Sequence, residues 1–323
     1  MDGSSLPVAI LVLRTCFIGI VATLILAGNA LSITVTRLMT ELSSSTRILM
    51  TSLAVVDLLT GLTVIPSIVA SAQDAWTFGY PACVAQGFVA NWLYLESAML
   101  VILLNVQRYI AIVRPLRYRT LCTPRRVVFT IVIPTVLIVS VSLIEEFVLG
   151  TTIAYSSERV FCTLDLTKLN LPLQIVVFFL CCLIPLAAMV FMQVRIGIIM
   201  RRQARAVCPD DMSGRWVGRI RFNPRKTERR TTRLFLVVTL VFTLVWVPSQ
   251  IFYVYAAFAT ATPIPGWVQF AITWLCMCNS FVNVFVYCLF LGNFRRVAAR
   301  SARCGQCGSR VAATPSASEI SHR

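Results

Sequence analysis

The chain has 323 residues, of which 58% are hydrophobic and 13% are charged, and its mean hydropathy is +0.80. A soluble domain carries about 25% charged residues, so this composition excludes an ordinary soluble domain and makes lipid the expected solvent. The formal net charge of +16 does not indicate nucleic-acid binding, because the basic residues fall between apolar blocks and not along one soluble face.

Seven apolar stretches follow one another along the chain. Each has about 20 residues or more, enough to cross a hydrocarbon core of about 30 Å as a helix. Backbone groups in lipid must hydrogen-bond within their own segment, so we predict an all-α membrane protein, a seven-transmembrane helix bundle. The predicted spans are 15–36, 48–70, 84–113, 127–149, 172–194, 232–258 and 268–291.

These spans form one transmembrane domain, 15–291, after a short outer segment, 1–14. The start, MDGSSLP, lacks the basic region of a cleaved signal peptide. After the last span we expect a short amphipathic membrane-surface helix at 292–307 and a disordered tail at 308–323, because the tail is small and polar.

The basic residues predict the orientation of the bundle. Two lie between the first and second spans, five at 114–126, eleven in the loop 195–230 and six from Arg295 onward, whereas the opposite loops contain Arg159 and Lys168. Cytoplasmic loops carry the excess of Lys and Arg, so we predict an extracellular N-terminus and a cytoplasmic C-terminus. The basic loops should also attract anionic inner-leaflet lipids, by about 1 kcal/mol per nearby charge.

Of the twelve cysteines, only Cys83 and Cys162 fall at the oxidising outer face. A disulfide between them would tether the loop between the fourth and fifth spans over the bundle; the alternative is two free thiols. Cys304 and Cys307 follow the basic stretch FRRVAARSAR, where S-palmitoylation is plausible.

Several polar residues lie near mid-membrane on the second, third and seventh spans: Asp57, Ser97, Asn279, Ser280 and Asn283. An isolated charge there costs at least about 2.5–3.5 kcal/mol, so Asp57 should be paired, protonated or bound to a cation. Glu96 is a second acid within the spans. Helical spacing turns it away from the side of Tyr94 and Ser97, so we favour a contact to a neighbouring helix over a ligand anchor.

Nearly every predicted span contains one short motif. The motifs are Gly28-Asn29, LAVVD ending at Asp57, WTFG from Trp76, Cys83, QRY at 107–109, Pro185, FTLVWVP from Phe242 to Pro248, and NSFVNVFVY from Asn279 to Tyr287. With these motifs in this order, the chain resembles a rhodopsin-like (class A) G-protein-coupled receptor over residues 15–307. The resemblance implies a multi-pass plasma-membrane receptor that transmits binding of an extracellular ligand to heterotrimeric G proteins, with arrestin as a further partner.

The resemblance also implies a switch through the bundle. Its residues would be Arg108, Tyr109, Glu228, Phe242, Trp246, Pro248, Asn283 and Tyr287. Arg108 would exchange a Glu228 partner for a cytoplasmic protein; the alternative is an arginine that merely snorkels to the interface. Trp246 and Phe242, one helical turn apart, would act as a lever beside the kink that Pro248 permits.

In the resembling family the mid-membrane oxygens coordinate sodium, so Asp57, Ser97, Asn279, Ser280 and Asn283 form a candidate allosteric sodium site. Hard oxygen ligands suit such an ion. The alternative is a hydrogen-bonded water network without an ion. No cofactor is otherwise required. Retinal is excluded, because a Schiff base needs a lysine in the seventh span and the only lysines are Lys168 and Lys226.

The outer half of the bundle offers a few polar groups among apolar neighbours, which suits a ligand cavity. They are Asn91, Tyr94, Gln174, Gln250, Tyr253 and Thr273, beside Trp246. Ala90 stands where amine receptors of the family place an aspartate, so we expect a non-amine small molecule or a lipid-like ligand.

Four departures from the family pattern put ordinary switching in doubt. Gln107 replaces an acid, Val284 replaces a proline, Gln193 replaces a tyrosine, and the fourth span has no tryptophan. They predict raised basal activity, or a receptor-like protein with weak or lost coupling. The rival class is an ion transporter or channel, with Asp57 and Glu96 on its path. An enzyme is not expected, because the sole histidine, His322, lies in the tail.

Overall fold

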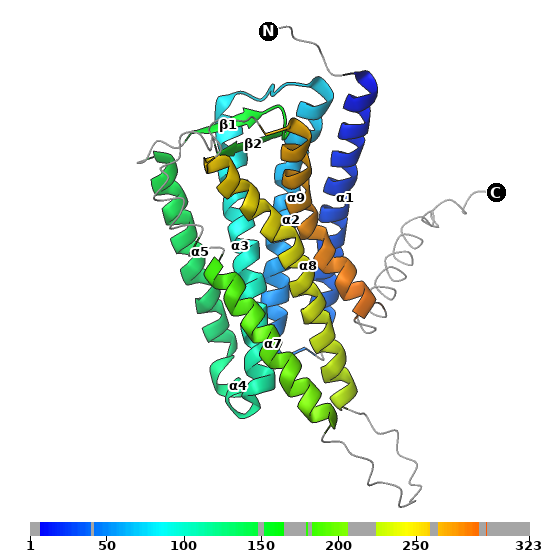
Figure 1. The fold of residues 1–323 in the computed structure, drawn as a ribbon, viewed down its shortest axis with the longest axis vertical. Coiled ribbons are helices and arrows are strands. Elements are labelled where there is room, and N and C mark those ends of the chain that lie inside the picture. The colour runs from blue at the N-terminus through cyan, green and yellow to red at the C-terminus, as the bar shows by residue number, and fades with distance from the viewer. Residues whose placement is uncertain are drawn as a thin grey trace, which may run out of the picture.

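The computed structural model describes residues 7–39, 42–147, 152–164, 179, 183–205, 224–258, 264–290 and 295. These residues form a helical bundle with a two-stranded hairpin at one end (Figure 1). The elements are α1 (Val8–Leu38), α2 (Ser44–Gln73), α3 (Tyr80–Val113), α4 (Pro115–Leu121), α5 (Pro124–Phe147), β1 (Ile153–Ser156), β2 (Phe161–Leu164), α7 (Ile184–Arg205), α8 (Pro224–Phe258) and α9 (Gly266–Phe290).

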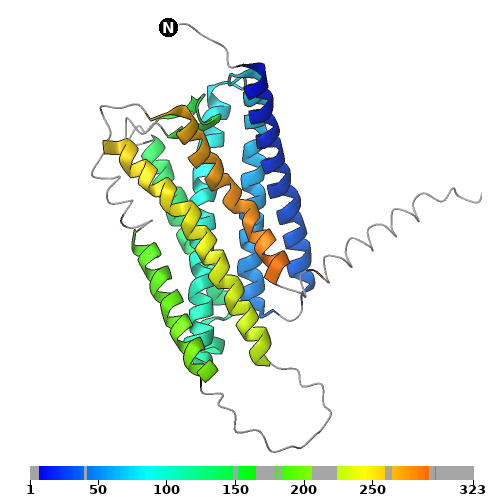
Figure 2. The same ribbon diagram turned by 45° about the vertical axis from the view of Figure 1, so that its right-hand side comes forward.

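The seven predicted spans fall, in order, on α1, α2, α3, α5, α7, α8 and α9, so the predicted seven-helix bundle is confirmed. Among the described residues, five of these helices are long and apolar enough to cross a membrane, and α7 and α8 contain shorter apolar stretches, Ile184–Ile199 and Leu236–Phe252. Figure 2 shows the helices running side by side along the length of the molecule.

Helix α1 extends beyond the predicted first span at its N-terminal end. Helix α1 begins at Val8, about two turns before residue 15. The added turns contain a charged residue, Arg14. In the structure Arg14 remains inside the helix because Asp74, at the C-cap of α2, neutralises it at 2.8 Å.

Helix α3 lies at the centre of the bundle and packs against α2, α5, α7 and α8. Its apolar side chains at Leu93, Leu100, Val101 and Leu104 are almost completely buried. By contrast, α1 and α5 leave large apolar side chains exposed, as expected for helices that face lipid.

The hairpin β1–β2 pairs antiparallel, with Tyr155 opposite Cys162. It lies across the outer end of α3 and close to α9 (Figure 1). Its tight turn places Val160 at a positive φ of 55°, an uncommon conformation for a β-branched residue, and buries that side chain completely.

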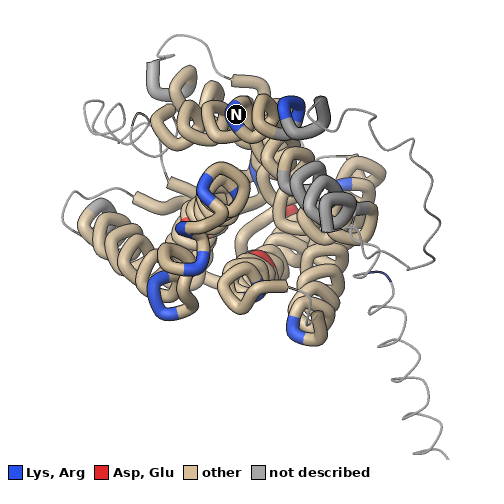
Figure 3. The backbone as a smooth tube through the Cα atoms, turned by 90° about the horizontal axis from the view of Figure 1, so that it is seen from below, with Lys and Arg blue, Asp and Glu red and all other residues tan. Residues whose placement is uncertain are grey.

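The described basic residues gather at helix ends, as the view along the bundle shows (Figure 3). Arg37, Arg47 and Arg114 lie at the ends of α1, α2 and α3 that are remote from the hairpin. The charge asymmetry predicted from the sequence therefore coincides with the two ends of the bundle.

Candidate functional site

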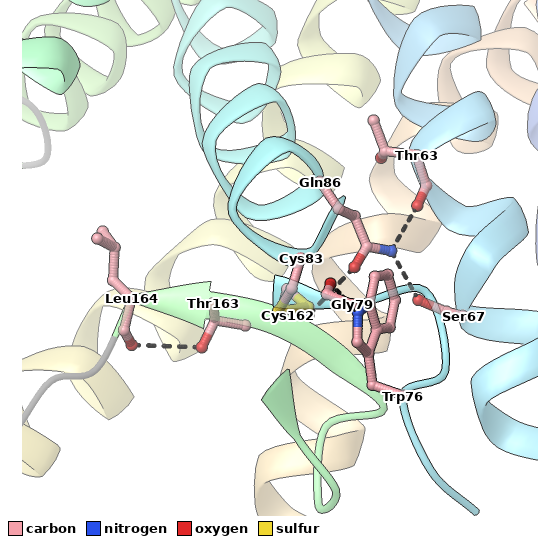
Figure 4. Close-up of a disulfide and its surroundings, with 9 residues drawn as sticks. All are labelled: Thr63, Ser67, Trp76, Gly79, Cys83, Gln86, Cys162, Thr163 and Leu164. Atoms are coloured by element: carbon pink, nitrogen blue, oxygen red, sulfur yellow. Dashed lines mark hydrogen bonds between the residues drawn. A yellow bond between two sulfur atoms is a disulfide. The ribbon is translucent and has the colours of Figure 1, made fainter. Parts of the chain in front are cut away.

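The outer face is joined by a disulfide. Cys83 in the first turn of α3 bonds Cys162 in β2, with Cα atoms 5.4 Å apart, which confirms the predicted pairing. Gln86, one turn further along α3, links the same region to α2: its amide donates to the carbonyl of Thr63 at 2.8 Å and to Ser67 Oγ at 3.1 Å (Figure 4). The backbone N–H of Cys162 donates to Gln86 Oε1 at 3.3 Å.

Gly87 explains how closely the hairpin approaches α3. A Cβ at this position would lie 2.5 Å from Cγ2 of Ile153 and 2.9 Å from the carbonyl oxygen of Cys162. Any side chain here would therefore push the hairpin off the helix.

A second outer contact joins α1 to α2. Arg14 donates to Asp74 Oδ1 at 2.8 Å and to Ser71 Oγ at 3.1 Å, and Thr15 and Ser71 share a further hydrogen bond of 2.8 Å. Burial raises the pKa of the nearby Tyr155 phenol in the hairpin, so this group stays neutral at physiological pH. The sequence analysis missed the role of Arg14. The signal for it is an isolated basic residue within an apolar stretch, with Asp74 as the acid at the end of the next span.

The predicted ligand residues meet only in part. Tyr94 of α3 stacks on Trp246 of α8, with ring centroids 6.0 Å apart, and shares a hydrogen bond of 3.1 Å with Ser249. Gln250 donates to the Tyr94 hydroxyl at 3.4 Å. Asn91 and Thr273 are half-buried on α3 and α9. Gln174 and the side chain of Tyr253 lie outside the described residues.

Below this stack, the mid-membrane polar residues surround Asp57, which is fully buried. Ser97 donates to Oδ1 of the carboxylate at 3.0 Å and Asn283 donates to Oδ2 at 3.1 Å. Ser280 lies close to this carboxyl group. The structure thus brings together α2, α3 and α9 at one carboxyl group.

A small enclosed cavity adjoins this cluster. It has a volume of about 20 Å³ and is lined by Thr60, Ala90, Tyr94, Ser97, Phe242, Trp246, Cys276, Met277, Asn279 and Ser280. A space of this size admits one water-sized occupant. It connects the predicted ion ligands to the predicted lever residues.

Glu96 lies on another side of α3. The hydroxyl of Thr135 on α5 donates to its Oε1 at 2.9 Å, and the residue is 3% exposed. The predicted contact to a neighbouring helix is confirmed, and it places the acid away from the Asp57 cluster.

In the inner half, Gln193 occupies the place of the expected tyrosine and joins three helices. Its amide nitrogen donates to Asn105 Oδ1 at 2.7 Å and to Thr239 Oγ1 at 2.8 Å, and Thr239 donates to Asn105 Oδ1 at 2.6 Å. We call these three residues the polar knot. It connects α7, α3 and α8 without any charged group, and sequence reasoning had noted only the replacement.

At the inner rim, Gln107 is 4% exposed and donates to the Tyr118 hydroxyl of α4 at 3.2 Å. That hydroxyl also shares a 2.9 Å hydrogen bond with Ser43, the N-cap of α2. Arg108, the next residue, is half-buried. The ring of Tyr109 packs against Phe191 of α7, with ring centroids 6.4 Å apart. Glu228 lies near the start of α8, but its side chain is outside the described residues, so the predicted Arg108–Glu228 pair stays a prediction.

The lever residues share one side of α8. Phe242 stacks on Trp246 with ring centroids 5.5 Å apart, and Pro248 lies inside the same helix. Tyr287 of α9 is 1% exposed in the same apolar cluster as Phe242 and Trp246. This arrangement links the stack above to the inner half below.

The first and seventh spans meet at two of the motif positions. Asn29 donates to the backbone carbonyl of Ser280 at 3.0 Å. A Cβ added at Gly28 would be 3.5 Å from Val284, the residue in place of the usual proline. Val284 therefore packs against α1 and is 5% exposed.

Other predictions fall outside the described residues. They are the palmitoylation of Cys304 and Cys307, most of the surface helix 292–307, the tail 308–323, and much of the basic loop 195–230.

The structure is thus a bundle of seven long helices with an outer disulfide and a buried polar centre, and five of the helices, as far as the structure describes them, are long and apolar enough to cross a membrane. The sequence model of one family, described as "7 transmembrane receptor (rhodopsin family)", matches residues 28–287. The chain belongs to this family. It is therefore a multi-pass membrane receptor and not an enzyme, and membership implies an extracellular ligand and a heterotrimeric G protein as partners.

Individual proteins support this assignment. The histamine H2 receptor of Rattus norvegicus is 28% identical over 302 residues, covering 91% of this chain and 79% of the relative. Trace amine-associated receptor 9 of Rattus norvegicus is 27% identical over 296 residues, covering 86% and 83%. The crystal structure of squid rhodopsin matches with a TM-score of 0.76 at 18% identity, covering 94% of this chain and 88% of that one, and shows the shared fold.

Proposed function

We propose that this protein is a plasma-membrane receptor that binds a non-amine ligand in the outer half of the bundle and transmits the signal to a heterotrimeric G protein. The observation that carries the proposal is an aromatic stack on α8 that ends nearly one helical turn from the polar knot. Tyr94 stacks on Trp246, Trp246 stacks on Phe242, and Thr239, nearly one turn further, belongs to the polar knot. A ligand that repacks Trp246 would therefore act on the contact that holds α3, α7 and α8 together at the inner half.

The mechanism is a shift of population. A ligand that binds more tightly to the conformer with an open inner cleft raises the share of that conformer, and a G protein that binds the cleft does the same. Arg108 would change partners as α8 moves, from Glu228 to the G protein.

The proposal of a non-amine ligand rests on Ala90. This residue lines the small cavity beside Tyr94 and Trp246 and is 5% exposed, so its place offers no counter-ion to an ammonium group. The relatives above carry names of amine receptors, and their identity of 27–28% leaves room for a different ligand.

We also propose that Asp57, Ser97, Asn279, Ser280 and Asn283 hold a sodium ion. The donor set fits, because it supplies a carboxylate and neutral oxygens, which are hard ligands, beside a cavity of about 20 Å³. When bound, the ion would supply the charge that offsets the buried carboxylate. Ser97 and Asn283 orient that carboxylate between α3 and α9.

The inner face carries further proposals. Gln107 supplies no negative charge to hold Arg108, so raised basal signalling is expected. Palmitoylated Cys304 and Cys307 would anchor the surface helix, anionic lipids would bind the basic loops, and arrestin would share the inner cleft with the G protein.

A panel of G-protein dissociation sensors, in cells that express the chain without added ligand, tests the coupling. The proposal predicts a basal signal from at least one G-protein subtype that is absent from cells without the chain. Surface expression without any such signal would contradict the proposed coupling.

A further inference from the structure

The outer hairpin holds an arginine, Arg159, against α8 and α9. Arg159, in the turn between β1 and β2, is 8% exposed, although it belongs to an extracellular loop. The turn is held in place from both sides of this residue, because Trp274 Nε1 of α9 donates to the Arg159 carbonyl at 3.1 Å and Val160 is completely buried.

The guanidinium of Arg159 contacts neutral groups. Nε donates to Gln269 Oε1 at 3.2 Å and Nη1 donates to Thr163 Oγ1 at 2.8 Å, and the group lies 5.5 Å from the centroid of the Phe252 ring. Within the part of the chain that the structure describes, the one ion pair is Arg14–Asp74, so no described carboxylate balances Arg159. Buried charges are normally paired, which makes this position suited to an anion from outside.

The neighbouring acid is engaged elsewhere. The carboxylate of Glu158 occupies the space beside the Cα of Gly266, the first residue of α9, where any Cβ would overlap it. Glu158 is exposed, whereas Arg159 points toward α8 and α9.

An apolar groove includes Phe252, the ring that the guanidinium contacts. It lies between the outer ends of α8 and α9, has a volume of about 640 Å³, and is lined by Pro248, Ile251, Phe252, Tyr255, Ile264, Pro265, Val268 and Ile272. Ligand clefts commonly have volumes of about 300–1,000 Å³. Phe252 belongs to both features, since its ring faces Arg159 and also lines the groove. Ile251 is 63% exposed on the lipid-facing side.

We propose that this groove and Arg159 form the site of a single-chain amphiphile with an anionic head group. The apolar chain lies between α8 and α9, and the carboxylate or phosphate head accepts hydrogen bonds from the guanidinium in place of the neutral Gln269. Arg supports this role because its planar fork of N–H donors matches both head groups. The groove shares neither Trp246 nor Ala90 with the small cavity, so the inference goes beyond the proposed function and adds a separate site for acidic lipids.

The test uses the purified full chain in phosphatidylcholine nanodiscs with radiolabelled oleoyl lysophosphatidic acid as the probe, and empty discs as the blank. We expect saturable binding, with oleate as an effective competitor and the uncharged monooleoylglycerol at least about tenfold weaker. Oleate carries a carboxylate and the probe carries a phosphate, so their relative affinities show which head group the site prefers. Equal competition by monooleoylglycerol would contradict a role for charge.

Variants locate the site. Arg159→Gln should weaken binding at least about tenfold, and Arg159→Lys should retain more of it, whereas Lys168→Gln, which removes another outer positive charge, should leave it unchanged. Val268→Trp should fill the groove and abolish binding, and Leu244→Trp, on the exposed face of the same bundle, should not. Unchanged binding by Arg159→Gln, or equal losses in Val268→Trp and Leu244→Trp, would overturn the proposal. If Arg159→Gln does not purify as a monodisperse protein, binding by Arg159→Lys, Val268→Trp and Leu244→Trp tests the proposal.

This binding assay contains no G protein. Binding without any cellular signal would refute the proposed coupling alone, and a basal signal without binding would refute the acidic-lipid site alone.

Discussion

Gln107 is a neutral residue at the inner rim, next to Arg108 in the sequence. Gln107 donates a hydrogen bond to Tyr118, whereas an aspartate would accept one from it and would also attract the neighbouring guanidinium of Arg108. Position 107 therefore adds no negative charge next to Arg108 in the sequence.

Gln107→Asp should lower ligand-free signalling, because the new carboxylate holds Arg108 in the resting arrangement. The matched variant Gln107→Asn keeps the group neutral and should retain the signal of the parent chain. Basal G-protein dissociation, normalised to surface expression, measures both. An equal signal from the two variants would show that charge at this position is unimportant.

Asp57 is the residue on which sodium binding depends. In detergent, replacing choline chloride by sodium chloride should raise the unfolding temperature of the parent chain, because an ion that binds only the folded state stabilises it. Asp57→Asn keeps the side-chain shape and should remove this difference. A sodium effect that persists in Asp57→Asn would place the ion elsewhere.

At the scale of elements, polar contacts between helices supplement apolar packing. The polar knot ties α3, α7 and α8, and the disulfide with Gln86 ties α2, α3 and the hairpin. Both contacts join segments that are far apart in the sequence, so each restricts how the helices move relative to one another.

Gln193 and Thr239 should be energetically coupled through the knot. Hydrogen bonds between membrane helices average about 0.6 kcal/mol in double-mutant cycles. We therefore expect a coupling of about 0.6 kcal/mol between Gln193→Ala and Thr239→Val in unfolding free energy. Additive effects of the two substitutions would mean that the hydrogen bond contributes nothing to stability.

Loss of the outer disulfide should destabilise the fold by about 2–4 kcal/mol, because the cross-link limits the freedom of the unfolded chain. Cys83→Ser and Cys162→Ser should lower the unfolding temperature alike. Cys16→Ser, at an exposed free thiol of α1, serves as the control and should have no effect. A normal unfolding temperature in Cys83→Ser would rule out a stabilising role for the bond.

The sequence predicted the helices well, because lipid demands long apolar segments and leaves few alternatives. The angle between residues on α3 also predicted that Glu96 faces a neighbouring helix. Other contacts were beyond such reasoning. Two strands of four residues leave little signal in a loop, so the hairpin and the buried Arg159 were missed. The partners of Gln193 are Thr239 and Asn105, which lie 46 and 88 residues away along the chain. Hydrophobic periodicity does not specify which polar side chains meet.

At the scale of the whole molecule, the bundle has two chemically different ends. The hairpin end carries the disulfide and a buried arginine, and the opposite end carries the exposed basic residues. Between them, the aromatic stack and the polar knot connect the outer half with the inner half. The account as a whole depends on whether Arg108, at the inner end of α3, takes part in that connection.

The most direct test is ligand-free G-protein dissociation in cells that express the parent chain or Arg108→Met at equal surface levels. Arg119→Met, at an exposed arginine of α4, is the matched control for loss of an inner positive charge. We predict that Arg108→Met loses the basal signal and that Arg119→Met keeps it. A signal from Arg108→Met as strong as that of the parent chain would contradict the account.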